Sequence, residues 1–358
     1  MLSSRKAVCE MHEYHPPLAG RTGLRLDFNE NTTGCSPRVL ARLRAITAED
    51  LARYPEREPV EALVAEYLRL PPDQVLLTNG VDEAIHLLCE TYLEPSDHAI
   101  VVTPAFSMYE IFAEATGAQV VRVQAGEDLR FPFDAVMRAV AAPTRLIAVA
   151  SPNNPTGSVA SREQLMAIAK SAPNAALLVD EAYYEFYGET VLSDVVRQPN
   201  LFVARTFSKA YGLAGLRIGI LVGPREQMPM VRRVSSPYSV NAMALLALPE
   251  ALADSAFVAG YVADVNSGRS RLEGALTRAK VQWWPSKANF VLFRVGPQHR
   301  EFVEAMRRHG ILVRDRSSDP GCDGCVRITL GTASQTDRLL AAMQEVLRDL
   351  KLGAEVPA

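Results

Sequence analysis

A lysine in the glycine-rich stretch TFSKAYGLAGLRIG is the residue of this chain best placed for covalent chemistry. Lys209 follows the apolar run 201–204, so we expect it just beyond the end of a buried strand. Thr206 and Ser208 offer hydroxyl donors beside it, and Arg217 adds a forked cation eight residues later. Glycines in the same stretch let the backbone approach a bound molecule closely. These residue types favour a ligand that has both an anionic group and a group that reacts with an amine.

A phosphorylated aldehyde satisfies both requirements, and pyridoxal 5'-phosphate is the cofactor that we expect. Lys209 would hold it as a Schiff base and, once displaced by substrate, would carry protons. The phosphate would lie at the start of an early helix, on the backbone N–H groups of Val81, Asp82 and Glu83. Acidic side chains in that first turn are compatible with this, because the donors are backbone groups and the helix dipole favours acids there.

Side chains that follow other apolar runs are further candidates, because ligands of open parallel sheets bind outside the carboxyl ends of the strands. Asp180 closes one run, and a carboxylate buried there needs a cation, for which a protonated pyridine nitrogen is suitable. Tyr183 follows three residues later, and Asn154 lies in the turn SPNNPTG after another run. Phe106 and Tyr109 are available to stack on an aromatic ring, although such residues also pack in cores.

The apolar pattern alternates between strand-like and helical periods from residue 74 to 222. This indicates an α/β fold in which a mostly parallel, seven-stranded sheet lies between helices. The first helix is expected to have Ser36 as its cap, and a later one to open with a capping box from Ser161 to Gln164. The predicted strands are 74–78, 99–103, 119–123, 146–150, 176–180, 201–205 and 217–222, and the predicted helices between them lie near 81–93, 107–116, 132–141 and 161–171.

After about residue 246 the helical patterns lengthen and the strands become more separated, which indicates a second, smaller α+β domain. Its last helix is expected to open at Ser334, with Asp337 three residues on. Its predicted strands are 289–295, 311–315 and 325–330. The expected segments are an N-terminal arm with the first small-domain helix (1–46), a large cofactor-binding domain (47–246) and the small C-terminal domain (247–358).

Composition and charge are those of an ordinary globular protein. The chain has 358 residues, of which 48% are hydrophobic and 22% charged, and its formal net charge is -3. We therefore expect no nucleic-acid or membrane partner. The most apolar stretch, 242–262, is interrupted by Pro249 and Asp254 and is expected to be a buried helical region. The N-terminus lacks the apolar core of a signal peptide, so a cytoplasmic location is expected.

The five cysteines are scattered and do not form a disulfide framework. Cys322 and Cys325 make a single C-x-x-C without a second pair or a histidine pair at zinc spacing, so no metal site is expected. We expect both to be small residues of a surface loop.

The segments NPTG, DEAY and SKAYGLAGLRIG, in this order and spacing, resemble those of the fold-type I pyridoxal-phosphate aminotransferases. The likeness extends from about residue 29 to 332. NEN (29–31) and VRITLGT (326–332) make the chain look most like histidinol-phosphate aminotransferases. The resemblance implies Lys209 as the Schiff-base lysine. It further implies Asp180 on the pyridine nitrogen, Asn154 with Tyr183 on the ring hydroxyl, and Ser208, Arg217 and the 81–83 backbone on the phosphate.

The same resemblance implies how substrate and partner are bound. Arg327 matches the position that binds the anionic end of the substrate, and Arg314 matches a second arginine on a substrate phosphate. Tyr14 lies near the N-terminal tyrosine that closes the site. Tyr54 matches the tyrosine that reaches the cofactor phosphate of the neighbouring subunit, so a homodimer is the expected functional unit. The chain departs from the pattern at Phe106, where the family usually has tyrosine, and in lacking a proline after NEN.

The implied reaction is transamination in histidine biosynthesis, from histidinol phosphate and 2-oxoglutarate to imidazole acetol phosphate and L-glutamate. An aromatic amino acid aminotransferase and a carbon–sulfur lyase or decarboxylase with the same cofactor are alternatives, because pocket walls decide which substrate reacts. A regulator built on this fold would need a DNA-binding segment, and there is neither a basic patch nor spare length before Leu26 to hold one.

Overall fold

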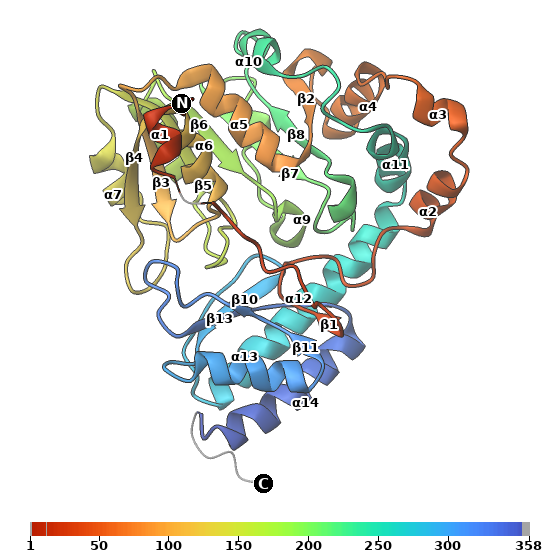
Figure 1. Cartoon of the computed structure of the whole chain (residues 1–358), viewed down its shortest axis with the longest axis vertical. Coiled ribbons are helices and arrows are strands. Elements are labelled where there is room, and N and C mark those ends of the chain that lie inside the picture. The colour runs from red at the N-terminus through yellow and green to blue at the C-terminus, as the bar shows by residue number, and fades with distance from the viewer. Residues whose placement is uncertain (1, 12, 353–358) are drawn as a thin grey trace.

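The computed structural model describes residues 2–11 and 13–352. A larger part contains a seven-stranded sheet covered by helices, and a smaller part contains a four-stranded sheet with helices against it (Figure 1). The long helix α12 (Ser255–Arg278) runs from the first part into the second. The α/β architecture predicted from the alternating pattern is confirmed, whereas the domain boundaries at residues 46 and 246 stay predictions.

All seven predicted strands of the large sheet are present, in the spatial order β2-β8-β7-β6-β5-β3-β4. β8 is antiparallel to both of its neighbours, and the other pairs are parallel. The chain between β7 and β8 contains no crossover helix, and without one two neighbouring strands pair in opposite directions. The strands are β2 (Val75–Thr78), β3 (His98–Thr103), β4 (Gln119–Gln124), β5 (Thr144–Ala150), β6 (Ala176–Asp180), β7 (Leu201–Thr206) and β8 (Gly219–Val222).

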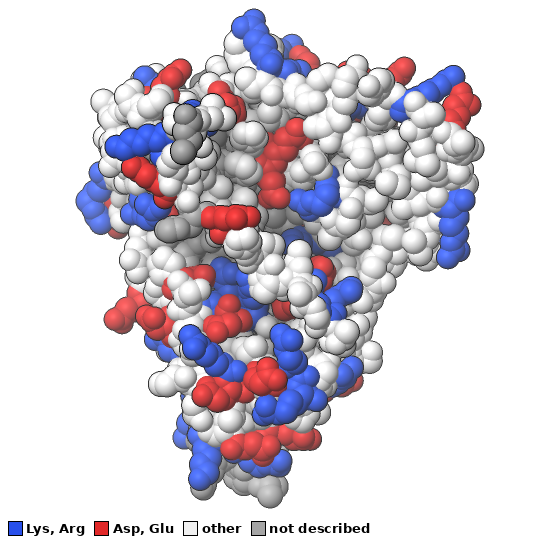
Figure 2. Space-filling model, viewed as in Figure 1, with Lys and Arg blue, Asp and Glu red and all other residues white. Residues whose placement is uncertain are grey.

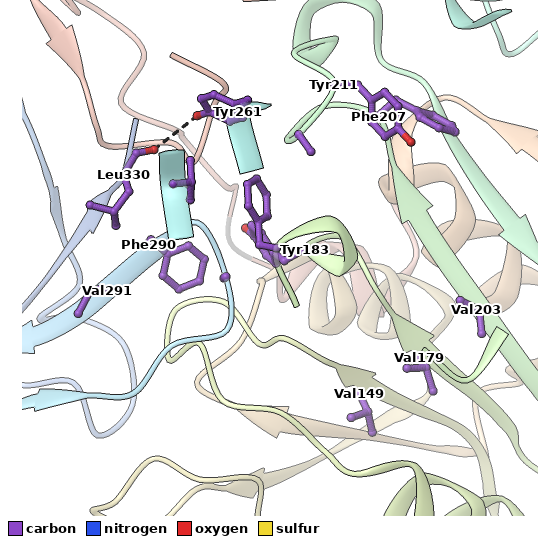
Figure 3. Packing of buried hydrophobic residues seen from close by; sticks show 14 of the residues in the cluster. Val149, Val179, Tyr183, Val203, Phe207, Tyr211, Tyr261, Phe290, Val291 and Leu330 are labelled. Carbon is purple, nitrogen blue, oxygen red and sulfur yellow. Dashed lines mark hydrogen bonds between the residues drawn. The ribbon is translucent and has the colours of Figure 1, made fainter. Parts of the chain in front are cut away.

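The sheet is buried on both faces, which explains the unbroken apolar runs. In β6, Leu177 and Val179 pack on one face, while Leu178 packs on the other. Figure 3 shows Val149, Val179 and Val203, from three adjacent strands, in the hydrophobic cluster that also contains Leu177. The helices around the sheet include α4 (Glu58–Leu68), α5 (Gly80–Tyr92), α6 (Met108–Thr116), α7 (Phe133–Ala139), α8 (Arg162–Ser171), α9 (Tyr184–Tyr187), α10 (Met228–Val234) and α11 (Ala242–Ala253).

Two of the three helix N-caps predicted from the sequence are confirmed. Ser36 caps α2 (Pro37–Arg44), and Ser161 with Gln164 forms the expected capping box of α8. The prediction for the last helix is wrong: α14 (Ala333–Asp349) begins one residue before Ser334, and its capping box is formed by Thr332 and Gln335. Thr332 and Gln335 have the same three-residue spacing as the predicted pair, and Asp337 instead binds Arg271. The remaining helices are α1 (Lys6–Cys9), α3 (Ala48–Ala52) and α13 (His299–Arg308).

The small sheet has the order β12-β13-β10-β9, with every neighbouring pair antiparallel. The predicted strand 311–315 is split into two strands, of which the first pairs with the N-terminal segment in a separate two-stranded sheet. The second places Arg314 directly opposite Arg327. The strands are β1 (Leu24–Arg25), β9 (Trp283–Trp284), β10 (Phe290–Arg294), β11 (Ile311–Leu312), β12 (Arg314–Asp315) and β13 (Cys325–Thr329).

Within the described residues, no single helix is long and apolar enough to cross a bilayer. α11 and α12 meet such a test only as a pair, and they are bent by 77° at their junction. On the face shown in Figure 2, lysine and arginine side chains are interspersed with aspartate and glutamate, so this face has no extended surface of one charge.

The expectation that Cys322 and Cys325 are surface-loop residues is wrong. Both side chains are fully buried and pack with Trp284 and Leu292. The reason is that β13 begins at Cys325, so the loop that joins it is folded against the small sheet. Among the described residues there is no group of three histidine, cysteine or acidic side chains that could hold a metal ion.

Candidate active site

A cavity of about 230 Å³ lies at the carboxyl ends of the central parallel strands. Ala150, Asp180 and Thr206, which end β5, β6 and β7, are part of its wall. This is the position where open α/β sheets bind ligands. The predicted site residues that line it are Val81, Asp82, Phe106, Asn154, Asp180, Tyr183, Thr206, Ser208, Lys209 and Arg217.

Lys209 lies in the cavity wall, and its Nζ donates a hydrogen bond to the carbonyl oxygen of Phe28 at 3.1 Å. Burial and, as the second cause, the nearby Arg327 together lower the pKa of Lys209 to about 8. A larger share of the amine is therefore neutral near neutral pH than for an exposed lysine. That is the state in which an amine attacks a carbonyl carbon.

Asp180 is buried, with only 4% of its surface exposed. Its carboxylate accepts hydrogen bonds from the Tyr109 hydroxyl at 2.5 Å and from the backbone N–H of Ala182 at 2.9 Å. Burial raises the pKa of Asp180 to about 6, although both hydrogen bonds act in the opposite direction. A carboxylate in this environment would be stabilised by a cation in the cavity.

Tyr109 has a role that its sequence position did not indicate. The sequence made its ring available either for stacking on a ligand or for core packing; in the structure it is 2% exposed, it lies edge-on to Phe106, and its hydroxyl is directed at Asp180. The bond joins a helix that follows β3 to the end of β6, and β5 lies between these strands. The sequence contains no signal for that pairing.

Tyr183 is also buried, and its hydroxyl accepts a hydrogen bond from Nδ2 of Asn29 at 2.8 Å. Asn29 has a left-handed backbone with a φ of 57°, a conformation that asparagine adopts more readily than most residues. The motif NEN was recognised in the sequence, but this contact to Tyr183 was not predicted.

Asn154 and Arg327 are in direct contact, since a terminal nitrogen of Arg327 donates to Oδ1 of Asn154. The other terminal nitrogen donates to the Asp27 carbonyl oxygen at 2.7 Å. Within the described residues, the buried Nε of Arg327 has no hydrogen-bond acceptor. Burial lowers the pKa of Arg327 to about 9, and the nearby Arg316 contributes. A buried guanidinium with an unused donor is suited to an anion.

The start of α5 faces the cavity beside hydroxyl donors and an arginine. Val81 and Asp82 line the cavity there, and Arg217 donates to the Asp82 carboxylate at 2.9 Å. Gly80, which begins α5, has a φ of 74°, a left-handed backbone conformation that favours glycine. Glu83 does not line the cavity, and its carboxylate instead accepts a hydrogen bond from the Asn79 backbone. Backbone donors, hydroxyls and a guanidinium together suit a phosphate group.

Besides Glu83 and Arg327, three further predicted residues lie outside the cavity wall. Tyr54 is 79% exposed and packs against Tyr238, with ring centroids 4.5 Å apart. Tyr14 is exposed, and its hydroxyl acts to raise the pKa of Arg314, which burial lowers. The Arg314 guanidinium lies 4.9 Å from the ring centroid of Phe28, which does line the cavity.

The acidic neighbours of Arg314 in the sequence are already paired with other side chains. Asp315 contacts His299 at 2.9 Å, and Asp319 binds Arg316. In the part of the chain that the structure describes, Arg314 itself has no ion-pair partner. Arg314 therefore does not form a surface ion pair with Asp315 or Asp319 in this structure.

A family model and the sequences of known proteins both identify this chain as similar to aminotransferases. Residues 21–343 match the family model of aminotransferase class I and II. The chain is 38% identical to a histidinol-phosphate aminotransferase from Symbiobacterium thermophilum, over 97% of this chain and 99% of that protein.

Solved structures share the whole fold. The structure of histidinol-phosphate aminotransferase from Sinorhizobium meliloti in complex with pyridoxal-5'-phosphate superposes with a TM-score of 0.87. It is 25% identical and covers 96% of this chain and 97% of its own. A mutant of aspartate aminotransferase from Thermus thermophilus is 26% identical with a TM-score of 0.81, over 97% of this chain and 100% of its own.

Proposed function

Because this chain belongs to aminotransferase class I and II and uses pyridoxal 5'-phosphate, we propose that it is a histidinol-phosphate aminotransferase of histidine biosynthesis. It would transfer the amino group between histidinol phosphate and 2-oxoglutarate, with imidazole acetol phosphate and L-glutamate as products. The observation that carries this proposal is the pair Arg314 and Arg327, which are directly opposed on β12 and β13 beside the cavity. Two arginines match the greater charge of a substrate phosphate.

The residues of the cavity fit the cofactor. Asp180 is a buried carboxylate that a cation would stabilise, and Lys209 is a buried amine with a lowered pKa. When bound, the cofactor supplies an electron sink for cleavage of a bond at the substrate carbon. We assign Asp180 to the pyridine nitrogen, Phe106 to the ring face, Asn154 and Tyr183 to the ring hydroxyl, and the backbone of Val81, Asp82 and Glu83 with Thr206, Ser208 and Arg217 to the phosphate.

Lys209 is proposed to move the proton in each half-reaction. Among the described residues, its Nζ donates a hydrogen bond to one neutral carbonyl oxygen and forms no ion pair, so the amine is free to rotate toward a reacting carbon. A pKa of about 8 lies close enough to neutral pH for the amine to accept and return a proton.

Arg327 is proposed to bind the carboxylate of glutamate and, together with Arg314, the phosphate of histidinol phosphate. The unused Nε of Arg327 supports the first role, and the absence of an ion pair at Arg314 within the described residues supports the second. Tyr14 would close the site above Arg314, since its hydroxyl acts to raise the pKa of that arginine.

We also propose that the enzyme acts as a cytoplasmic homodimer in which Tyr54 contacts the cofactor phosphate of the partner subunit. The support is the high exposure of Tyr54, which lies outside the cavity of its own chain and packs against the half-exposed Tyr238. An exposed pair of aromatic rings is typical of a surface that another molecule covers.

Purified enzyme loaded with the cofactor tests the substrate assignment. We expect kcat/KM with 2-oxoglutarate to be highest for histidinol phosphate, and far lower for phenylalanine and tyrosine. A preference for the aromatic amino acids would support the aromatic aminotransferase instead. Release of ammonia or carbon dioxide without amino transfer would support a lyase or a decarboxylase.

A further inference from the structure

Asn29 is the centre of a buried hydrogen-bond network that joins three parts of the chain. It belongs to the N-terminal segment and is 1% exposed. Its backbone carbonyl accepts from Nδ2 of Asn289 at 3.1 Å, and its side chain contacts both Thr329 in β13 and Tyr183 beyond β6. The small sheet, the N-terminal segment and the large sheet therefore meet at one side chain.

Thr329 determines which way the Asn29 amide is oriented. The Thr329 hydroxyl oxygen accepts from the Asn29 backbone N–H at 3.1 Å. Its single proton is donated to Oδ1 of Asn29 at 3.0 Å. With Oδ1 engaged in this way, the amide nitrogen Nδ2 faces Tyr183, to which it donates at 2.8 Å.

This orientation has a consequence for Tyr183. An amide nitrogen can donate but cannot accept, so the Tyr183 oxygen is the acceptor of this bond and its own proton is left for another partner. Tyr183 lines the cavity, and Asn29 is the hydrogen-bond partner of its hydroxyl among the described residues. Because Tyr183 lines the cavity, its proton is available to a group bound there.

We propose that Asn29, locked by Thr329, is a positioning residue that makes the Tyr183 hydroxyl donate its proton to the ring oxygen of the bound cofactor. The proposal rests on the proposed function, because that function supplies the acceptor. A donated proton stabilises the ionised ring oxygen, and so it sets the pH at which the lysine-bound cofactor changes its visible absorbance. Arg327 from β13, Arg316 just after β12 and Asp180 from β6 are the charged groups that act on Tyr183, and all remain in the variants below.

Asn29→Asp reverses the polarity of the contact while keeping a residue that tolerates the left-handed backbone. A carboxylate must accept from Tyr183, which withdraws the proton from the cavity. We expect the absorbance transition of the holoenzyme to move upward by about one pH unit. Asn31→Asp places the same charge two residues away, where the asparagine contacts the Ala210 carbonyl instead, and is expected to move the transition less.

Thr329→Val and Thr329→Ser test the lock without a change of charge. Valine removes the hydroxyl that fixes the amide, so a smaller upward shift is expected, whereas serine keeps the hydroxyl and the wild-type transition. The proposed positioning role of Asn29 is wrong if Thr329→Val and Thr329→Ser show the same absorbance transition. It is also wrong if Asn31→Asp shifts the transition as far as Asn29→Asp does. If Asn29→Asp does not fold, the comparison of Thr329→Val with Thr329→Ser is the deciding test. Wild-type protein without any lysine-bound absorbance would refute the proposed function itself, which is a different result.

Discussion

The hydroxyl of Tyr109 donates to the carboxylate of Asp180 at 2.5 Å, and both side chains are almost completely buried. Two opposing effects act on Asp180. Burial raises its pKa to about 6, while the Tyr109 hydrogen bond favours the ionised form and acts to lower it. Tyr109 therefore helps to keep Asp180 charged for a cationic partner.

We predict that Tyr109→Phe makes cofactor binding more sensitive to acid. Loss of the hydroxyl leaves burial less opposed, so the pKa of Asp180 rises and the carboxylate is protonated at higher pH. The affinity of the cofactor-free protein for pyridoxal 5'-phosphate, titrated from pH 5 to 8, should begin to fall at a pH about one unit higher than in wild type. Identical profiles for the two proteins would show that the bond has no electrostatic role.

Asp180→Asn should stabilise the cofactor-free protein at pH 7 while it abolishes most of the turnover. The pKa of Asp180 is higher in the folded state than its ordinary value, so the folded protein binds the proton more strongly. Asp180 therefore adds to the free energy of unfolding at low pH, and this stabilisation is lost as the pH rises through about 6. The difference corresponds to roughly 3 kcal/mol at full ionisation.

Chemical denaturation of the cofactor-free proteins at several pH values measures this effect. The variant should be more stable than wild type at pH 7 to 8, and its advantage should vanish near pH 4. Wild-type protein that is more stable at every pH would contradict a buried carboxylate held there for catalysis. Loss of cofactor affinity in proportion to turnover would mean that Asp180 is structural.

The sequence predicted the large sheet and much of the cavity wall for one physical reason. Strands buried on both faces are apolar throughout, so the point where each run ends is visible, as at Asp180 and before Lys209. Ligands collect at those ends whatever the order of the strands. Residues that directly follow an apolar run could therefore be identified without knowing which strands are neighbours.

Contacts that depend on strand order or on the N-terminal segment could not be identified in this way. The bond between Tyr109 and Asp180 crosses from a helix after β3 to β6, and the bond between Asn29 and Tyr183 joins residues 154 positions apart. The direction of β8 and the split of residues 311–315 between two sheets are likewise set by tertiary pairing. None of these changes the local hydrophobic period, which is the signal that the sequence offers.

Tyr54→Phe is predicted to weaken cofactor binding in the partner subunit rather than in its own. Mixing Tyr54→Phe chains with Lys209→Ala chains would give hybrid dimers in which one site has both changes and the other has neither. At limiting cofactor, the mixture should recover activity that neither variant shows alone. The unmixed variants, taken through the same dissociation and reassociation, are the controls. Activity equal to the average of the two would argue that Tyr54 acts within its own subunit.

We predict that Arg314 distinguishes a phosphorylated substrate from one that is only aromatic. Its acidic neighbours Asp315 and Asp319 are paired elsewhere, and its guanidinium lies over the ring of Phe28 in the cavity wall. Arg314→Ala should lower kcat/KM for histidinol phosphate by about 10- to 100-fold, the value of one charge-assisted hydrogen bond, mainly through KM. The half-reaction with glutamate, which has no phosphate, should change little.

Two comparisons make the Arg314 test specific. Arg327→Ala should damage both half-reactions, because the unused Nε of this arginine is available to either carboxylate or phosphate. Arg294→Ala removes an arginine of the same sheet that lies over Trp284, and it should leave both half-reactions close to wild type. Arg314→Lys should recover part of the lost affinity, since it keeps the charge without the fork. If Arg314→Ala is neutral for every substrate and the wild type prefers phenylalanine or tyrosine, the phosphate assignment is wrong, and the aromatic aminotransferase replaces it.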